Sequence, residues 1–363
     1  MVTEQKTRAR VVVGMSGGVD SSAAAALLMK QGYEVIGITL KLWPQDCVSR
    51  AEDKCCGPQA VMDARSVSHK LGIPYYLVDE AAEFQKQVIN YFAEEYRAGR
   101  TPNPCVMCNE RLKFGNLINR ARQLGAEYIA TGHFARVEKD PDTGRFLLKR
   151  GRDARKDQSY FLFSLKQEQL ARVIFPLGEM TKSDTREIAR DEHLKTAEKE
   201  ESMEICFVPD KDYGRFLQQS RLVDKHKGEI VDTTGKVLGQ HDGIEFYTIG
   251  QRKGLGISSP KPLYVIELDA KNNRVIIGDE ALLERAEFAV ERCNWIPYEN
   301  PPASIEVMAK IRYNHPGTPA TIIPDAKGGA QVKLHTAQRA ITPGQACVFY
   351  NADVVVGGGW IAR

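Results

Sequence analysis

A glycine- and serine-rich segment near the N-terminus has the residue types of a phosphate-binding loop. The string SGGVDSS, residues 16–22, follows an apolar run at 11–13 and precedes an alanine-rich stretch at 23–30. Gly17 and Gly18 let the backbone approach an oxyanion closely, and the free N–H groups at the start of a helix attract phosphate. The segment has neither the ending of a Walker A loop nor the dinucleotide pattern GxGxxG. We therefore predict a nucleotide-phosphate loop of another class.

Three cysteines could supply a thiolate for nucleophilic chemistry. Cys105 and Cys108 lie in the segment PNPCVMCN, residues 102–109, ahead of a helix predicted at 110–124. Two prolines disfavour a helix before Cys105, so Cys108 is predicted just ahead of a helix N-terminus, where the dipole favours the thiolate. The alternative is half of a zinc site, although no second CxxC or HxxxH pair completes it. Cys206 lies between apolar neighbours, and alone it has the pattern of a buried hydrophobic residue.

The first half of the chain alternates between apolar strands and helices. We predict strands at 11–13, 34–40, 75–78 and 128–131, and helices at 20–30, 60–71, 82–97, 110–124 and 182–194. Such βαβ units form a right-handed parallel sheet, in which ligands bind beyond the carboxyl ends of the strands. Leu40 and His133 follow strands at that edge, although a lone histidine there is more often a structural hydrogen-bonding residue.

The pattern changes near residue 228 to short alternating segments joined by turns. Strands are predicted at 287–294, 305–313, 320–323, 331–335, 346–350 and 353–357, after hairpins between 228 and 278. Many short strands of this kind fit a small barrel, and Cys293 and Cys347 are predicted to be packing residues within it. We therefore divide the chain into domains at 1–209, 210–282 and 283–363.

Composition limits the class of protein. The 363 residues carry a net charge of +3 with 27% charged residues, and no long apolar run could span a membrane. We expect a cytoplasmic protein, whose eight cysteines are metal ligands, thiol catalysts or core residues rather than structural disulfides. No role is assigned to Cys47, Cys55 and Cys56. The basic segment 149–156 leads into aromatic residues, a mixture that suits RNA, although charge alone fits a solvated loop equally well.

Seven motifs together resemble one enzyme family. SGGVDSS, GRTPNPCVMCN, TGHFAR, KDQSYFL, ICFVP, TIGQRKGLGI and ITPGQACVFY occur in the order seen in tRNA-specific 2-thiouridylases. SGGVDSS by itself resembles the pyrophosphate loop of the wider ATP-pyrophosphatase superfamily. The resemblance implies an α/β N-terminal domain with a parallel sheet of the adenine nucleotide alpha-hydrolase type. It further implies a small, mostly-β central domain that binds tRNA and a C-terminal β-barrel.

The same resemblance implies a sulfurtransferase activity. Enzymes of this kind use ATP, with Mg²⁺, to adenylate the C2 oxygen of the wobble uridine in tRNA, and they replace that oxygen with sulfur. Cys108 matches the nucleophile and Cys206 the cysteine that carries sulfur as a persulfide, and the reaction can leave a disulfide between them. A sulfur-relay protein or a cysteine desulfurase is the implied donor.

Residue roles are carried over by position in the motifs. ATP contacts are implied for Gly14, Met15, Ser16, Gly17, Gly18, Val19, Asp20, Ser21, Leu40 and Gly132, with Asp20 counted as catalytic. Target-base and tRNA contacts are implied for Asn103, Pro104, Cys105, His133, Lys156, Asp157, Gln158, Arg312, Tyr313 and Gln345.

Alternatives to the persulfide route remain open. Some family members carry Asp where this chain has Cys105, so that Cys105, Cys108 and Cys206 could hold an iron–sulfur cluster. We favour the persulfide because a fourth cluster ligand is not evident. Another ATP-pyrophosphatase ligase, such as an amidotransferase-type synthetase, is a second alternative, and a non-catalytic RNA-binding or zinc-scaffold protein is a third.

Overall fold

The computed structural model describes residues 8–42, 57–200, 205–208 and 212–363. The chain forms two compact units. The first comprises Met1–Gln87, Cys105–Pro209 and Asp353–Val355, and the second comprises Val88–Pro104, Asp210–Ala352 and Val356–Arg363. Cys47, Cys55 and Cys56 lie outside the described residues. No helix in the described ranges is both long enough and apolar enough to cross a membrane.

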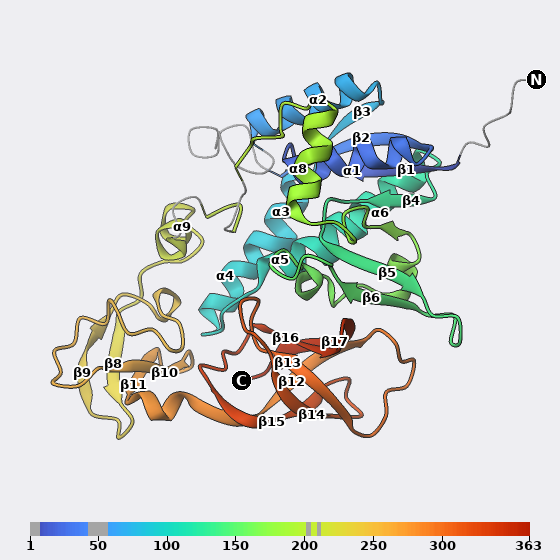
Figure 1. Cartoon of the computed structure of the whole chain (residues 1–363). Helices are drawn as coiled ribbons and strands as arrows, with labels where there is room; N and C mark the ends of the chain where they lie inside the picture. The colour runs from blue at the N-terminus through green and yellow to red at the C-terminus, as the bar shows by residue number, and fades with distance from the viewer. Residues whose placement is uncertain (1–7, 43–56, 201–204, 209–211) are drawn as a thin grey trace, which may run out of the picture. The chain divides into compact units, whose positions relative to one another are not determined.

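A parallel sheet forms the centre of the first unit (Figure 1). Its strands are β1 (Arg8–Gly14), β2 (Tyr33–Lys41), β3 (Tyr75–Asp79), β4 (Tyr128–Ala130) and β7 (Val173–Ile174), in the order β3-β2-β1-β4-β7. Every pairing within it is parallel. Val11, Val12 and Val13 of the central strand are fully buried, as expected for a strand covered on both faces. The predicted α/β class and parallel sheet are confirmed.

Helices cover this sheet. They include α1 (Val19–Lys30), α2 (Pro58–Leu71) and α8 (Lys182–Asp191). A separate continuous helical run comprises α3 (Ala81–Phe84), η2 (Gln85–Ile89) and α4 (Asn90–Arg97), and it begins in the first unit and ends in the second. Four consecutive alanines, Ala23–Ala26, are buried in α1. Small side chains allow α1 to lie close to its neighbours, and α8 packs along it (Figure 1).

The helix that carries Cys108 begins earlier than its sequence predicts. Helical residues run without a break through α5 (Pro104–Met107), η3 (Cys108–Asn116) and α6 (Leu117–Gln123). Proline fits the first helical turn, where no N–H partner is needed, so Pro104 starts the helix instead of preventing it. The prediction that Cys108 lies just ahead of the helix N-terminus is therefore wrong. The thiol lies one turn inside, where the helix dipole acts less strongly.

Several elements between β4 and α8 were not predicted. An antiparallel hairpin joins β5 (Ala135–Lys139) to β6 (Phe146–Arg150), and η4 (Ser159–Leu162) and α7 (Gln167–Leu170) follow. Part of the predicted basic segment therefore belongs to a strand. Lys149 on β6 pairs with Glu138 on β5 at 2.5 Å. One positive charge of the basic segment is therefore neutralised within the protein.

The second unit holds two β structures. A four-stranded sheet has the order β10-β11-β8-β9, from β8 (Gly228–Asp232), β9 (Val237–His241), β10 (Tyr264–Asp269) and β11 (Arg274–Gly278). It is accompanied by α9 (Tyr213–Gln219) and η5 (Ile244–Phe246). The sheet confirms the small β domain that the sequence predicts.

A closed barrel follows η6 (Glu280–Leu283). Its strands are β12 (Glu284–Trp295), β13 (Ile305–Lys310), β14 (Thr318–Pro324), β15 (Ala330–Arg339), β16 (Ala346–Asn351) and β17 (Val354–Ile361), and pairing of β12 with β17 closes it. Burial alternates along β13 and β15, which places every second residue in the core. Cys347 is fully buried and Cys293 partly buried, and burial raises the pKa of the Cys293 thiol to about 12. Both are packing residues, as predicted.

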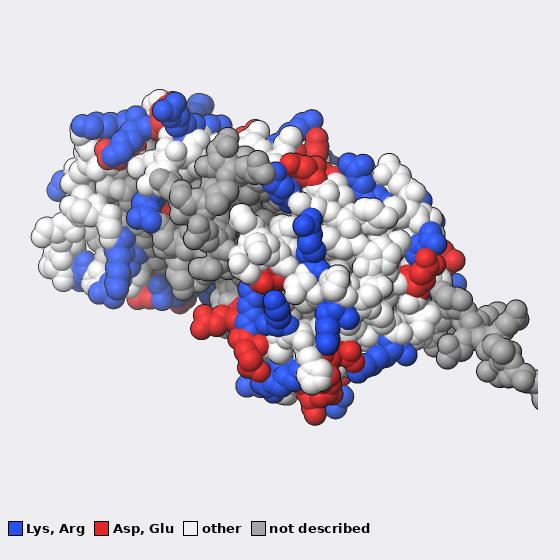
Figure 2. Space-filling view, turned by 90° about the horizontal axis from the view of Figure 1, so that it is seen from above, with Lys and Arg blue, Asp and Glu red and all other residues white. Residues whose placement is uncertain are grey.

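Charged side chains of both signs occur on the face in Figure 2. Lysine and arginine side chains (blue) stand at several separate places there, with acidic side chains (red) close to some of them. This distribution agrees with the small net charge of +3.

Candidate active site

The predicted phosphate loop joins the carboxyl end of β1 to the first turn of α1. Gly17 has a φ of +70°, and a Cβ there would lie 2.1 Å from the carbonyl oxygen of Ala60. Only glycine fits this position. The Ser21 hydroxyl accepts a hydrogen bond from the Ser16 N–H at 3.1 Å and donates to the Gly18 carbonyl at 3.2 Å. The loop is thus held in shape by its own side chains before any ligand binds.

The ends of neighbouring strands approach this loop. A Cβ on Gly132, just after β4, would lie 2.6 Å from the carbonyl carbon of Asp20 and 2.7 Å from the nitrogen of Ser21. On the other side, Thr39 of β2 donates its hydroxyl to the Met15 carbonyl at 2.7 Å, and Leu40 follows it. The sheet therefore brings together the strand ends that sequence reasoning assigned to ATP.

Two lysines at the loop were missed by sequence reasoning. Lys182 Nζ lies 2.6 Å from Asp20 Oδ1, and its side chain is only 13% exposed. Lys199 Nζ donates to the Gly17 carbonyl at 3.1 Å and pairs with Asp63. Both lie more than a hundred and sixty residues beyond the loop that they contact. Nothing in their local sequence marks them, because only the folded sheet brings them to the loop.

These lysines change the electrostatics of the loop. A carboxylate beside a phosphate site repels the anion, and the Lys182 ammonium offsets the Asp20 charge. A charge-assisted contact from lysine to phosphate is stronger than a neutral one. The loop together with its two ammonium groups is therefore suited to a polyphosphate.

No group of three or more His, Cys, Asp and Glu in the described ranges is placed to hold a metal ion. Cys105, Cys108 and Cys206 are described residues, so they form no such group. A Mg²⁺ ion that arrives with ATP needs only one or two carboxylates, because phosphate oxygens and water complete its shell. Asp20 could supply one such carboxylate.

The candidate catalytic cysteines differ in exposure. Cys108 is 8% exposed and begins the π-helical segment η3, whereas Cys105 and Cys206 are partly exposed. Cys206 is therefore less buried than its apolar neighbours suggest. Phe207, the next residue, is buried and packs edge-on against Phe84 with ring centroids 5.8 Å apart. This contact anchors the Cys206 segment within the first unit.

None of the five described cysteines, at 105, 108, 206, 293 and 347, forms a disulfide in this structure. A disulfide between Cys108 and Cys206 therefore remains a prediction about turnover.

His133 lies inside the first unit. It is 9% exposed, its Nδ1 is 2.8 Å from the Thr131 hydroxyl, and Phe114 and Phe175 flank its ring. Burial, assisted by the positive charge of Lys113, holds the pKa of His133 well below its usual range. The imidazole is neutral at physiological pH, and the hydrogen-bonding role is the one its surroundings favour.

The segment with Lys156, Asp157 and Gln158 is shaped by its own hydrogen bonds. The Asp157 carboxylate accepts from the N–H groups of Gly151 and Ser159 at 3.1 and 3.0 Å, and Gln158 Oε1 accepts from the Phe134 N–H at 3.0 Å. Asp157 is 7% exposed, whereas Lys156 is only half-buried. The side chains of Asp157 and Gln158 therefore build the turn that presents Lys156.

The second unit holds the remaining residues assigned to tRNA. Asn103 is 7% exposed, and Gln345 Nε2 donates to the carbonyls of Thr101 and Pro102 in the same loop. Tyr313 lies beneath the Lys310 ammonium, 5.7 Å from its ring centroid. Arg312 is exposed, with one guanidinium nitrogen 3.5 Å from the Arg339 carbonyl.

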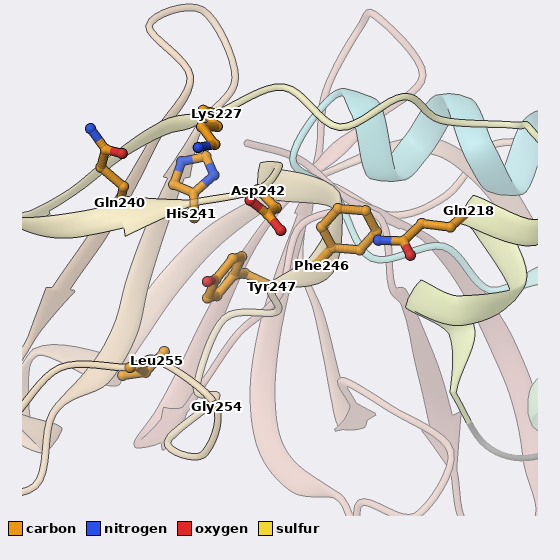
Figure 3. A pocket seen from close by; sticks show the side chains of 10 residues that line it. Gln218, Lys227, Gln240, His241, Asp242, Phe246, Tyr247, Gly254 and Leu255 are labelled. Carbon is orange, nitrogen blue, oxygen red and sulfur yellow. The ribbon is translucent and has the colours of Figure 1, made fainter.

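A pocket of about 520 Å³ opens in the four-stranded β domain (Figure 3). His241 lines it, but its Nδ1 accepts from the Gly243 N–H at 3.0 Å and its Nε2 contacts the Asn273 carbonyl at 3.2 Å. Asp242, also at the pocket, pairs with Lys225 at 2.8 Å. These groups are used within the domain itself, so we assign no reaction to the pocket.

Comparison with known proteins covers nearly the whole chain. Three family profiles match in succession: a tRNA methyl transferase HUP domain at residues 9–210, a tRNA methyl transferase PRC-barrel domain at 214–279 and an aminomethyltransferase beta-barrel domain at 285–361.

Three full-length relatives are each named tRNA-specific 2-thiouridylase MnmA. The protein of Moorella thermoacetica is 53% identical over 352 residues, covering 96% of this chain and 98% of the relative. That of Geobacter metallireducens is 50% identical over 361 residues, covering 98% of each chain. That of Geotalea uraniireducens is 51% identical over 365 residues, covering 99% of this chain and 96% of the relative.

Proposed function

Because the chain belongs to the family of tRNA-specific 2-thiouridylases, we propose that it replaces the C2 oxygen of the wobble uridine in tRNA with sulfur at the expense of ATP. One observation carries the proposal: the SGGVDSS loop lies at the carboxyl end of a parallel sheet with Lys182 and Lys199 against it. We place the reaction in the cytoplasm.

Adenylation is the first step of this reaction. A carbonyl oxygen is a poor leaving group, so the uracil C2 oxygen attacks the α-phosphorus of ATP, and the bond to the β-phosphate breaks. Pyrophosphate then leaves in the loop between Gly14 and Ser21, whose backbone N–H groups bind its oxygens. Lys182 and Lys199 stabilise the charge that develops on pyrophosphate.

Sulfur transfer is the second step. A desulfurase or relay protein loads Cys206 as a persulfide. The Cys108 thiolate attacks the Cys206 sulfur atom that is bonded to carbon, which forms a disulfide and releases the outer sulfur as sulfide. Sulfide then attacks C2, AMP leaves with the original oxygen, and 2-thiouridine remains. An external dithiol reduces the disulfide and restores both thiols.

The descriptions of two family profiles name methyl transfer, whereas the full-length relatives are named for thiolation. Methyl transfer needs an activated methyl donor and no cleavage of ATP. The phosphate loop and the two lysines favour the reaction that cleaves ATP.

The test is a reconstituted reaction. Purified full-length protein is incubated with a tRNA transcript, ATP, Mg²⁺, a dithiol and a persulfide-generating cysteine desulfurase, and the nucleosides are analysed by mass spectrometry. We expect 2-thiouridine at the wobble position, with one AMP and one pyrophosphate for each. A methylated uridine, or 2-thiouridine formed without ATP, would contradict the proposal.

A further inference from the structure

The loop from Arg100 to Pro104, here termed the Asn103 loop, is poor in hydrogen-bond donors. Proline has no N–H group, and both Pro102 and Pro104 belong to the loop. The Thr101 carbonyl therefore cannot close a β-turn onto residue 104. A donor for the Thr101 carbonyl must therefore come from outside this turn.

Gln345 supplies this donor. Its Nε2 lies 3.1 Å from the Thr101 carbonyl oxygen and 3.0 Å from that of Pro102. Carbonyl oxygens only accept, so the amide nitrogen faces them and donates to both. Of the polar atoms in this side chain, only Oε1 is left for another partner.

The backbone around Gln345 reinforces the contact. The Thr101 N–H donates to the Pro343 carbonyl at 2.8 Å. Gly344 has a φ of +88°, and a Cβ there would lie 2.9 Å from both the Thr101 carbonyl oxygen and Arg100 Cβ. The chain at 343–345 therefore approaches the loop as closely as its backbone atoms allow.

The first residue of the loop, Arg100, is tied to α4. The Arg100 guanidinium donates to both carboxylate oxygens of Glu95, at 2.7 and 2.5 Å, and the Glu95 side chain is 12% exposed. On the same helix, the Tyr91 ring packs edge-on against Trp360, and burial raises the pKa of the Tyr91 hydroxyl. Arginine and carboxylate groups paired in this bidentate way hold a defined geometry.

We propose that Gln345 is a positioning residue, which clamps the Asn103 loop to the barrel so that the loop presents a fixed surface to the target uridine. The inference rests on the proposed function for the role of the loop, but the clamp itself is a property of the second unit. This role is distinct from a direct contact between Gln345 and tRNA, which only Oε1 is left to make.

The test compares three full-length proteins: wild type, Gln345→Leu and Gln331→Leu. Leucine removes both donors at 345 at similar volume. Gln331 is an exposed residue of β15 and serves as the matched control.

Hydrogen exchange is the first measurement, and it requires no tRNA. Since the hydrogen bonds to the carbonyls of Thr101 and Pro102 are lost, we expect amide exchange in the peptide 99–104 to rise by about tenfold or more in Gln345→Leu. The control should exchange like wild type. Unchanged exchange at 99–104 in Gln345→Leu would overturn the clamp, whatever the protein catalyses.

The second measurement separates tRNA binding from the rate at saturation. If Gln345 is a positioning residue, we expect the tRNA dissociation constant of Gln345→Leu to lie within about twofold of the wild-type value. Its single-turnover thiolation at saturating tRNA should be about tenfold to a hundredfold slower than that of wild type. A weaker affinity with an unchanged saturated rate would show a direct RNA contact and overturn the proposal. If wild-type protein forms no 2-thiouridine, the proposed function fails, and hydrogen exchange still decides the clamp.

Discussion

Replacing Gly132 by alanine should displace the start of α1 from the end of the neighbouring strand β4. The added methyl carbon would lie 2.6 Å from the Asp20 carbonyl carbon, 2.7 Å from the Ser21 nitrogen and 2.9 Å from Asp20 Cβ. Two of these are backbone atoms, so no side-chain rotation relieves the clash. The first turn of α1 must move away from β4 by several tenths of an ångström or more.

The size of the effect follows from this displacement. Overpacking of a tight contact costs about 1–3 kcal/mol of stability, which lowers the melting temperature by about 2–4 °C per kcal/mol in a domain of this size. The catalytic effect is larger, because a misplacement of about 1 Å in a reacting group slows a reaction by about a hundredfold. The Gly132→Ala protein should therefore stay folded at 25 °C and lose most of its adenylation activity.

The assay is pyrophosphate release in the presence of tRNA and saturating ATP, with a thermal melt of each protein. Gly115→Ala is the matched control, since the nearest atom to its new Cβ is 3.4 Å away. The control should release pyrophosphate at the wild-type rate. Wild-type release by Gly132→Ala would refute the idea that Gly132 sets the position of the loop.

Further substitutions probe the same account. Cys108→Ser and Cys206→Ser should each abolish 2-thiouridine formation while tRNA affinity, measured by filter binding, stays unchanged; thiolation by either variant would exclude the two-cysteine route. Asp20→Ala and Lys182→Met should each reduce tRNA-dependent pyrophosphate release, the latter by about a hundredfold as for other charge-stabilising groups, with Lys182→Arg less affected; normal release would remove these residues from the site. Because burial lowers the pKa of His133, the unfolded chain binds a proton that the folded chain excludes. Thermal stability should fall as pH drops below about 6.5, and less steeply in His133→Gln; identical slopes would contradict this origin.

The fold was largely predictable because its signals are local. Buried valine runs, the alanine-rich helix and the glycine loop each lie within about a dozen consecutive residues, and together they predict the parallel sheet. The start of the Cys108 helix was mispredicted because proline disrupts the interior of a helix but is favourable in its first turn. Pro104 occupies the first turn. The hairpin β5–β6 was not predicted, and only its last two residues, Lys149 and Arg150, belong to the basic segment that was assigned either to RNA binding or to a solvated loop.

The site was predictable only in part. Gly17 and Gly132 follow strands and Leu40 lies near the carboxyl end of β2, so the rule for parallel sheets places them at one edge. Lys182 and Lys199 reach the loop through tertiary packing, which no local sequence pattern predicts. Likewise, the contact of Gln345 with Pro102 joins residues 243 positions apart.

Adenylation of the uracil oxygen is the central claim, and an isotope label tests it most directly. A tRNA carrying a heavy oxygen isotope at C2 of the wobble uridine is converted by the wild-type protein with ATP and a persulfide source, and the products are analysed by mass spectrometry. The account predicts that the label appears in the phosphate of AMP, in equal amount to the 2-thiouridine formed. Label found in water or pyrophosphate, or retained in the modified base, would contradict it.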